Sequence, residues 1–296
     1  MTAIVTGQDG SERQAFIAGW RSLNRPTPIR ELRTVSPAPG PLAMIDPSRV
    51  DAPEDSGIVC GSTALFADFL GNILTQARDD DVVVCARPAL VHDGGAGAWG
   101  ALGADPGVLA GAARRVTVAW TEATPLLSLH GRAAELSTRG LVAAERAQEA
   151  ERQVGQFVAD LARAPGFESA IGLARQAGTG MAGGLAFLLA AMGARLVDAG
   201  TEIAHRSGWK DQVAGADVVI ALCAEDDLLA AETGPLVQLS TIAAQAAVPL
   251  VVVGAAPGLP RRHLARMGIG AAHDRAGRTT WELGRALAAT WAARSV

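Results

Sequence analysis

Short apolar runs alternate with amphipathic stretches along most of the chain. The runs expected to form strands are residues 3–7, 82–86, 115–120, 218–222 and 249–254. The stretches whose apolar residues predict helices are 11–23, 64–77, 141–164, 181–194, 236–247, 260–267 and 279–293. Apolar strands that alternate with helices are typical of parallel sheets covered on both faces. The pattern therefore predicts an α/β fold, with ligands bound at the carboxyl ends of the strands.

The length of 296 residues is compatible with one large domain or two smaller ones, and we expect two. Five prolines and few periodic apolar positions occur between residues 36 and 55, which indicates a crossover or a linker between domains.

The charge pattern argues against nucleic acid and membranes as partners. The formal net charge is −4 and no long basic run occurs. The N-terminus lacks the basic start and long apolar stretch of a signal peptide. The apolar run 181–194 is too short to cross a bilayer. We expect a cytoplasmic protein.

Several motif classes are absent. The three cysteines form no C-x-x-C pair, and the five histidines show no spacing typical of metal ligands, so we expect no metal site of that kind. Neither G-x-x-x-x-G-K-[ST] nor G-x-S-x-G occurs, which excludes a P-loop and argues against a nucleophile-elbow hydrolase. No G-x-G-x-x-G opens a helix after the first strand, which weakens the case for a dinucleotide-binding protein.

Two glycine clusters are the main candidates for binding chemistry. Glycine leaves the backbone N–H groups accessible and permits positive φ, so either cluster could bind a phosphate or carboxylate ahead of a helix. The other interpretation is close packing of a helix or a sharp turn. The candidate residues are Asp93, Gly94, Gly95 and Gly97 in the first cluster, and Gly178, Thr179, Gly180, Gly183 and Gly184 in the second.

An acidic group follows the expected strand 218–222. Glu225, Asp226, Asp227 and Glu232 could hold a Mg²⁺-nucleotide through one or two carboxylates. They could equally be a solvated helix start, where acids interact favourably with the helix dipole.

The clusters resemble, in this order, motifs of the bacterial two-domain glycerate kinase family between about residues 59 and 256. Segment 61–65 is similar to the family's G-T-G-E-L, 92–97 to T-N-D-G-G-A-G, and 178–187 to G-A-G-A-A-G-G-L-G-F. Further similarity occurs at 120–127, which keeps Pro125 and Leu126, and at 208–220 and 248–251.

The resemblance implies two α/β domains. One is Rossmann-like and discontinuous, over residues 1–45 and 200–296, and the other is inserted, over 46–199. It implies phosphoryl transfer from ATP, with Mg²⁺, to glycerate or a related small hydroxy acid. It also implies that the glycine loops line the cleft between the domains, that Asp93 orients substrate or metal, and that Asp227 is the second catalytic acid. The oligomeric state stays open, with a homodimer as one option.

Several charged positions of the family motifs differ here. The aspartate and asparagine of C-D-V-x-N are Thr121 and Thr124, and the family's G-K is Thr233-Gly234. The N-terminal D-S-F-K-G-S corresponds to Asp9-Gly10-Ser11, so Asp9 and Ser11 are further candidates. Arg87 or Arg195 could replace the missing lysine, because a guanidinium can bind phosphate through two donors. These changes leave a second hypothesis, a catalytically lapsed paralogue that acts as a binding or regulatory protein.

Overall fold

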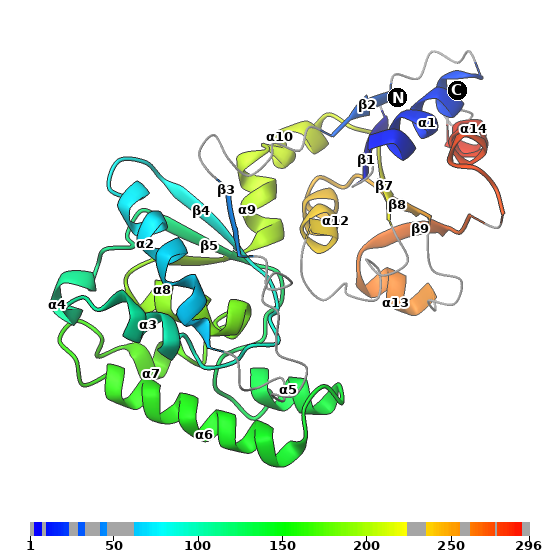
Figure 1. Cartoon of the computed structure of the whole chain (residues 1–296). Coiled ribbons are helices and arrows are strands. Elements are labelled where there is room, and N and C mark those ends of the chain that lie inside the picture. Colours follow the sequence, from blue (N-terminus) through cyan, green and yellow to red (C-terminus); the bar gives the residue numbers. More distant parts are fainter. Residues whose placement is uncertain are drawn as a thin grey trace. The chain divides into compact units, whose positions relative to one another are not determined.

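The computed structural model describes residues 3–7, 10–23, 29–32, 42–45, 62–223, 235–254, 261–275 and 277–291. The chain divides into two units, each with its own parallel sheet (Figure 1). The terminal unit joins Met1–Val35 to Ile203–Val296, and the central unit is Ser36–Glu202. The fold confirms the prediction of an α/β protein with parallel sheets.

The terminal unit contains a five-stranded parallel sheet in the order β2-β1-β7-β8-β9. Its strands are β1 (Ala3–Gly7), β2 (Ile29–Glu31), β7 (Val218–Leu222), β8 (Leu250–Val253) and β9 (Ile269–His273). Every residue of β7 and β8 is buried, which is why these two strands read as continuous apolar runs.

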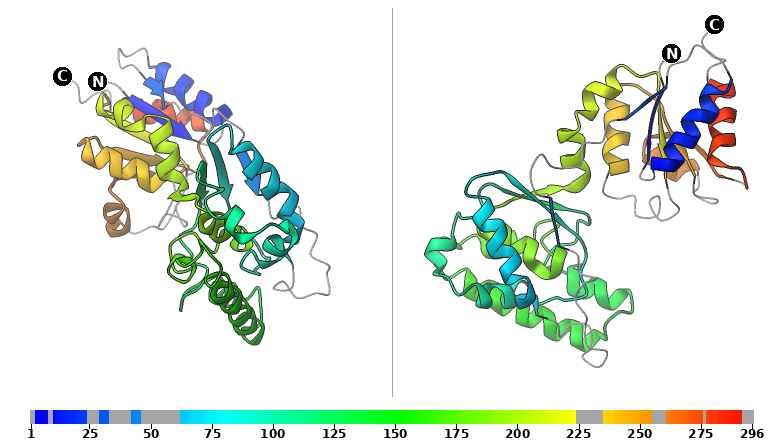
Figure 2. Two further views of the ribbon diagram at one scale, coloured as in Figure 1. Left: turned by 90° about the vertical axis from the view of Figure 1, so that its left-hand side faces the viewer. Right: turned by 45° about the horizontal axis from the view of Figure 1, so that its top comes forward.

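Helices cover both faces of this sheet. Helices α1 (Gly10–Arg21) and α14 (Thr280–Trp291) pack on the face that contains Val218 and Ile220, and α10 (Trp209–Ala214) and α12 (Pro235–Gln245) on the face that contains Val219. Helix α13 (Arg261–Arg266) precedes β9. Helices α1 and α14 lie side by side (Figure 2), and a Cβ added at Gly284 would lie 2.2 Å from the Phe16 carbonyl oxygen.

The central unit contains a four-stranded parallel sheet in the order β3-β4-β5-β6. Its strands are β3 (Leu42–Ile45), β4 (Val82–Ala86), β5 (Val116–Trp120) and β6 (Arg195–Asp198). Strand β3 lies inside the stretch that the sequence indicated as a crossover or linker. The strands are parallel, so the segments that follow β4, β5 and β6 leave the sheet at one edge, which we call the carboxyl edge.

The central unit also contains helices, most of which pack on the face of the sheet that contains Val84 and Val118 (Figure 1). They are the 3₁₀ helix η3 (Thr63–Phe66), α2 (Ala67–Gln76), α3 (Ala96–Leu102), α4 (Pro106–Leu109), α5 (Arg132–Thr138), α6 (Ala144–Leu161), α7 (Ala170–Leu173), the 3₁₀ helix η4 (Met181–Gly184) and α8 (Leu185–Ala191). Helix α9 (Ala199–Arg206) contains the boundary between the units.

The prediction of one helix over residues 181–194 is wrong. Ala182, Gly183 and Gly184 have φ values of 51°, 69° and 97°, which are incompatible with a right-handed helix. The segment instead contains the short helix η4, then helix α8, whose first five residues are buried, and then a turn that leads to β6. No helix in the described ranges is long and apolar enough to cross a membrane.

Candidate functional site

Asp93 lies in the turn between β4 and α3, where its carboxylate accepts hydrogen bonds from four groups of the described chain. Oδ1 accepts from the Gly95 amide at 2.9 Å, and Oδ2 accepts from the amides of Gly97 at 3.1 Å and Thr63 at 2.7 Å. The Thr63 hydroxyl donates to Oδ1 at 2.8 Å. The first amides of a helix have no partner within it, so Asp93 satisfies this end of α3. The predicted anion-binding amides of Gly95 and Gly97 therefore already bind a carboxylate of the protein.

Thr63 and Gly97 join η3 closely to α3. The buried Thr63 hydroxyl accepts a hydrogen bond from the Ala98 amide at 3.0 Å while it donates to Asp93. A Cβ added at Gly97 would lie 2.0 Å from Oγ of Ser62, which is far inside van der Waals contact. Glycine at position 97 is therefore required by packing.

The structure brings the two glycine clusters together. A Cβ added at Gly184 would lie 2.4 Å from the Cα of Gly94, so the two backbones approach more closely than any side chain would allow. Gly183 approaches the carbonyl oxygen of Val91, where an added Cβ would lie at 2.9 Å. Both Gly183 and Gly184 have left-handed φ, which glycine adopts without steric cost. The turn that follows β4 and the turn that precedes α8 thus form one packed unit.

The first part of the second cluster contacts the segment that follows β5. Thr179 is fully buried, and its hydroxyl accepts from the Leu126 amide at 2.9 Å. The Gly180 amide donates to the carbonyl oxygen of Thr124 at 3.1 Å. A Cβ added at Gly178 would lie 2.1 Å from Cγ of Trp120, at the end of β5. Loops from β4, β5 and η4 therefore meet at the carboxyl edge.

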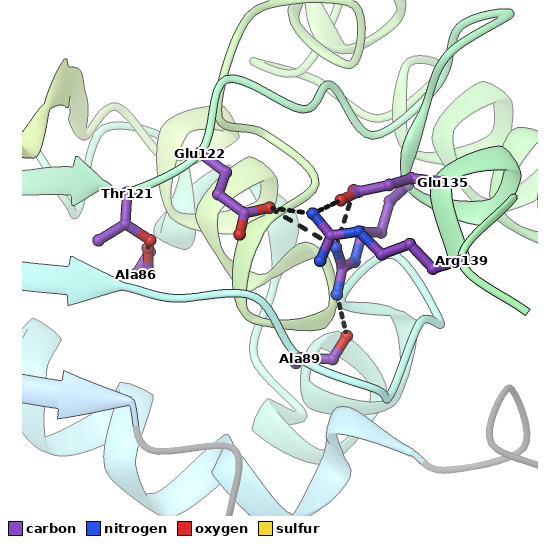
Figure 3. A network of polar contacts seen from close by, with 7 residues as sticks. Ala86, Ala89, Thr121, Glu122, Glu135 and Arg139 are labelled. Atoms are coloured by element: carbon purple, nitrogen blue, oxygen red, sulfur yellow. Dashed lines mark hydrogen bonds and ion pairs between the residues drawn. The ribbon is translucent and has the colours of Figure 1, made fainter. Parts of the chain in front are cut away.

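Two arginines and two glutamates lie beside these loops and form what we call the Arg132 cluster (Figure 3): Glu122, Arg132, Glu135 and Arg139. Glu135 bridges the two guanidinium groups, with contacts of 2.8 Å to Nη1 of Arg132 and 2.7 Å to Nη2 of Arg139. Nη2 of Arg132 also donates to the carbonyl oxygen of Ala89 at 2.9 Å. Because Ala89 follows β4 and Glu122 follows β5, the cluster lies at the carboxyl edge.

Glu122 occupies a different position from Glu135. Its Oε2 lies 3.9 Å from Nη1 of Arg132 and 3.7 Å from Nη2 of Arg139, beyond ordinary hydrogen-bond distance. Burial, then the negative charge of Glu135 and a hydrogen bond with Glu135, raise the pKa of Glu122, while the two arginines lower it. A partly buried carboxyl group with a raised pKa is a candidate functional group.

His92 is the buried neighbour of Asp93. Its side chain is 1% exposed, and neither ring nitrogen has a hydrogen-bond partner in the described part of the chain. Burial, and secondly the positive charge of Arg132, lower the pKa of His92 from 6.5 to about 4. The imidazole is therefore neutral at physiological pH.

Of the remaining predicted residues, one follows a strand at the carboxyl edge and the others lie elsewhere or outside the described residues. Arg87 follows β4 directly, with an exposed side chain and a carbonyl oxygen that accepts from the Ala182 amide at 2.8 Å. Arg195 begins β6 at the other end of the strand, and its guanidinium pairs with Glu202 at 2.8 Å. Ser11 lies in the first turn of α1, in the terminal unit. Asp9 and Asp227 lie outside the described residues.

Sequence reasoning missed the Arg132 cluster. The spacing of Glu135 to Arg132 and Arg139, three and four residues apart, is a helical ion-pair signal that could have been recognised. Glu122 could not have been placed from spacing, because it joins the others only through the fold. No group of three or more His, Cys, Asp or Glu in a metal-binding arrangement occurs among the described residues.

Two units, each built on a parallel sheet, define the class as an α/β protein. Proteins of this class commonly bind ligands beside the carboxyl ends of the strands, where the loops converge here. The family model described as glycerate kinase family matches residues 111–291, so the chain belongs to the glycerate kinase family. A crystal structure described as "putative glycerate kinase 2 from Salmonella typhimurium LT2" is similar in fold, with a TM-score of 0.71 at 15% sequence identity. The likeness covers 99% of this chain and 98% of that chain. A comparison with curated proteins found no match.

Proposed function

We propose that this protein binds a small hydroxy acid at the carboxyl edge of the central unit and transfers the γ-phosphoryl group of ATP to its hydroxyl. The observation that carries the proposal is the convergence of both glycine clusters and two arginines at this edge, in a chain of the glycerate kinase family. Family membership implies nucleotide-dependent phosphoryl transfer in general, and glycerate is the substrate class in the family name.

The turn at Asp93 does not fit a nucleotide phosphate. A phosphate at the start of α3 would compete with the Asp93 carboxylate for the amides of Gly95 and Gly97, and the two anions would repel each other. Both Asp93 oxygens also face N–H or O–H donors, which leaves this carboxylate poorly suited to bind Mg²⁺. We therefore propose that Asp93 holds the loop and that this turn takes no part in phosphoryl transfer.

The residues of the carboxyl edge suit the acceptor better than the nucleotide. Catalysis of phosphoryl transfer depends mostly on positioning and on neutralising charge, and ATP with Mg²⁺ would supply the phosphoryl group and part of that neutralisation. The chain itself supplies two guanidinium groups and a rigid frame of glycine turns at this edge.

A second candidate function is a catalytically lapsed paralogue that binds the hydroxy acid without phosphorylating it. The observation in its favour is the saturation of Asp93 and its neighbouring amides by contacts within the protein. Losing one transition-state contact typically costs a factor of about 10² to 10³ in rate. A chain that retains the fold and lacks several such contacts would bind its ligand and turn over very slowly.

A coupled assay separates the two candidates. Purified full-length protein is mixed with ATP, Mg²⁺ and D-glycerate, and ADP release is followed against a blank without D-glycerate. ADP release that depends on D-glycerate supports the kinase. No release above the blank, together with no rise in melting temperature on adding ATP, supports the lapsed paralogue.

The choice of catalytic variant follows from the geometry. Asp93→Asn would disturb four hydrogen bonds that hold the loop, so loss of activity in that variant would not identify a catalytic acid. Arg139→Gln is a better variant, because its side chain is half exposed and lies at the edge of the cluster. Arg152→Gln is the matched control, since Arg152 forms an exposed ion pair with Glu149 on α6.

A further inference from the structure

Arg132 and Arg139 each form ion pairs with the carboxylates of Glu122 and Glu135, at different distances (Figure 3). Glu135 contacts both arginines at hydrogen-bond distance, 2.8 Å and 2.7 Å. Glu122 approaches the same two groups only to 3.9 Å and 3.7 Å. The arginines therefore form long ion pairs with Glu122, without the hydrogen bonds that they form with Glu135.

The four side chains of the cluster differ in their exposure to solvent. The Arg132 and Glu135 side chains are 3% and 17% exposed, whereas those of Glu122 and Arg139 are 33% and 52% exposed. A small anion could thus reach the cluster on the side of Glu122 and Arg139, with Arg132 beneath. Glu135 would keep its bridging contacts while this happened.

We propose that Arg132 and Arg139 bind the carboxylate of the small hydroxy acid, and that Glu122 occupies the position of that carboxylate in the structure described here. The inference rests on the proposed function for the identity of the ligand. Arginine suits the role because its planar fork of donors matches the two oxygens of a carboxylate. The ligand replaces a carboxylate whose contacts with the two arginines are 3.9 Å and 3.7 Å long, so little attraction to the arginines is lost when Glu122 moves away. Glu122 would then also leave its hydrogen bond with Glu135.

The local charges support this exchange. Two arginines face two glutamates, and the neighbouring His92 is neutral, so a carboxylate can enter with least repulsion when Glu122 is displaced or protonated. The cluster also contacts the glycine loops, because a Cβ added at Gly180 would lie 3.1 Å from Cβ of Arg132. A carboxylate bound here would place the rest of a small hydroxy acid close to those loops.

Isothermal titration calorimetry of the full chain with D-glycerate, without nucleotide, tests the inference. We expect Arg139→Gln to weaken binding by about tenfold to a hundredfold, the range for losing a hydrogen bond to a charged group. We expect Glu122→Gln to tighten binding by about threefold to tenfold, because the internal competitor loses its charge. Arg152→Gln should bind within about twofold of the unmodified chain, and glycerol, which lacks the carboxylate, should give no detectable binding.

Three results would overturn the inference: no D-glycerate binding by the unmodified chain, equal binding by Arg139→Gln, or equal binding of glycerol. Circular dichroism melts show whether each variant is folded. If Arg139→Gln is unfolded, the binding of D-glycerate by Glu122→Gln tests the carboxylate site instead. ADP release from the same preparations keeps the two proposals apart. D-glycerate binding through Arg139 without turnover would refute the kinase alone, and turnover that is indifferent to Arg139 would refute the carboxylate site alone.

Discussion

His92 and Asp93 are adjacent in the sequence, but their side chains differ in how many hydrogen bonds they form. The Asp93 carboxylate accepts from four protein donors, whereas both ring nitrogens of the buried His92 lack a partner among the described residues. An unsatisfied buried polar group typically costs about 1 to 3 kcal/mol. At this scale Asp93 stabilises the turn and His92 destabilises it.

The acid sensitivity of folding tests the position of His92. The unfolded chain binds a proton at this residue near pH 6.5 and the folded chain only near pH 4. The free energy of unfolding should therefore be unaffected by His92 above pH 6.5 and fall as the pH drops from 6.5 to 4, by about 3 kcal/mol in all.

Urea unfolding at a series of pH values measures this effect, with His92→Leu as the comparison. The variant should lose about 3 kcal/mol less stability between pH 7 and pH 4 than the unmodified chain. An identical loss in both proteins would show that His92 is not buried and neutral.

At the scale of elements, the close approach of two turns determines the geometry of the carboxyl edge. Strand β4 ends at Ala86 and strand β5 at Trp120, and the turns that follow them are packed against η4 through glycines. Backbone packing explains the glycines at positions 94 and 184. Close packing was one of the two interpretations that the sequence left open for these clusters, and anion binding was the other.

Gly184→Ala tests this packing. An added Cβ would lie 2.4 Å from Gly94 at a φ of 97°, so we expect the free energy of unfolding to fall by about 2 to 4 kcal/mol. Gly155→Ala on α6 is the matched control, because within the described residues nothing beyond its chain neighbours and its own helix backbone lies within 4 Å of an added Cβ. Alanine there should stabilise the helix by about 0.5 to 1 kcal/mol. Chemical denaturation of both variants measures the difference, and equal stabilities would contradict the packing of the two turns.

At the scale of the whole molecule, the sequence predicted the apolar framework well. Strands β4 and β7 have the predicted bounds, because buried parallel strands are continuous apolar runs between polar turns. Strand β3 escaped recognition because its four residues lie in a stretch of five prolines. The prediction of one helix over 181–194 was wrong because it relied on apolar composition, which does not reveal that three consecutive residues have left-handed φ.

The candidate site was predictable only in part. The glycine clusters were visible as sequence motifs, but nothing in the sequence indicated that their backbones pack directly against each other. The pairing of Glu122 with Arg132 and Arg139 depends on how the fold places β5 and α5, because Glu122 lies ten positions before Arg132 and seventeen before Arg139 in the chain. Long-range ion pairs of this kind leave no periodic signal in a single sequence.

A crystal structure of the full chain with D-glycerate tests the central claim most directly, namely that the carboxyl edge of the central unit is the hydroxy-acid site. The account predicts the D-glycerate carboxylate between the guanidinium groups of Arg132 and Arg139, with Glu122 moved away from both. D-glycerate bound at another place in the molecule, with Glu122 still facing the two arginines, would contradict it.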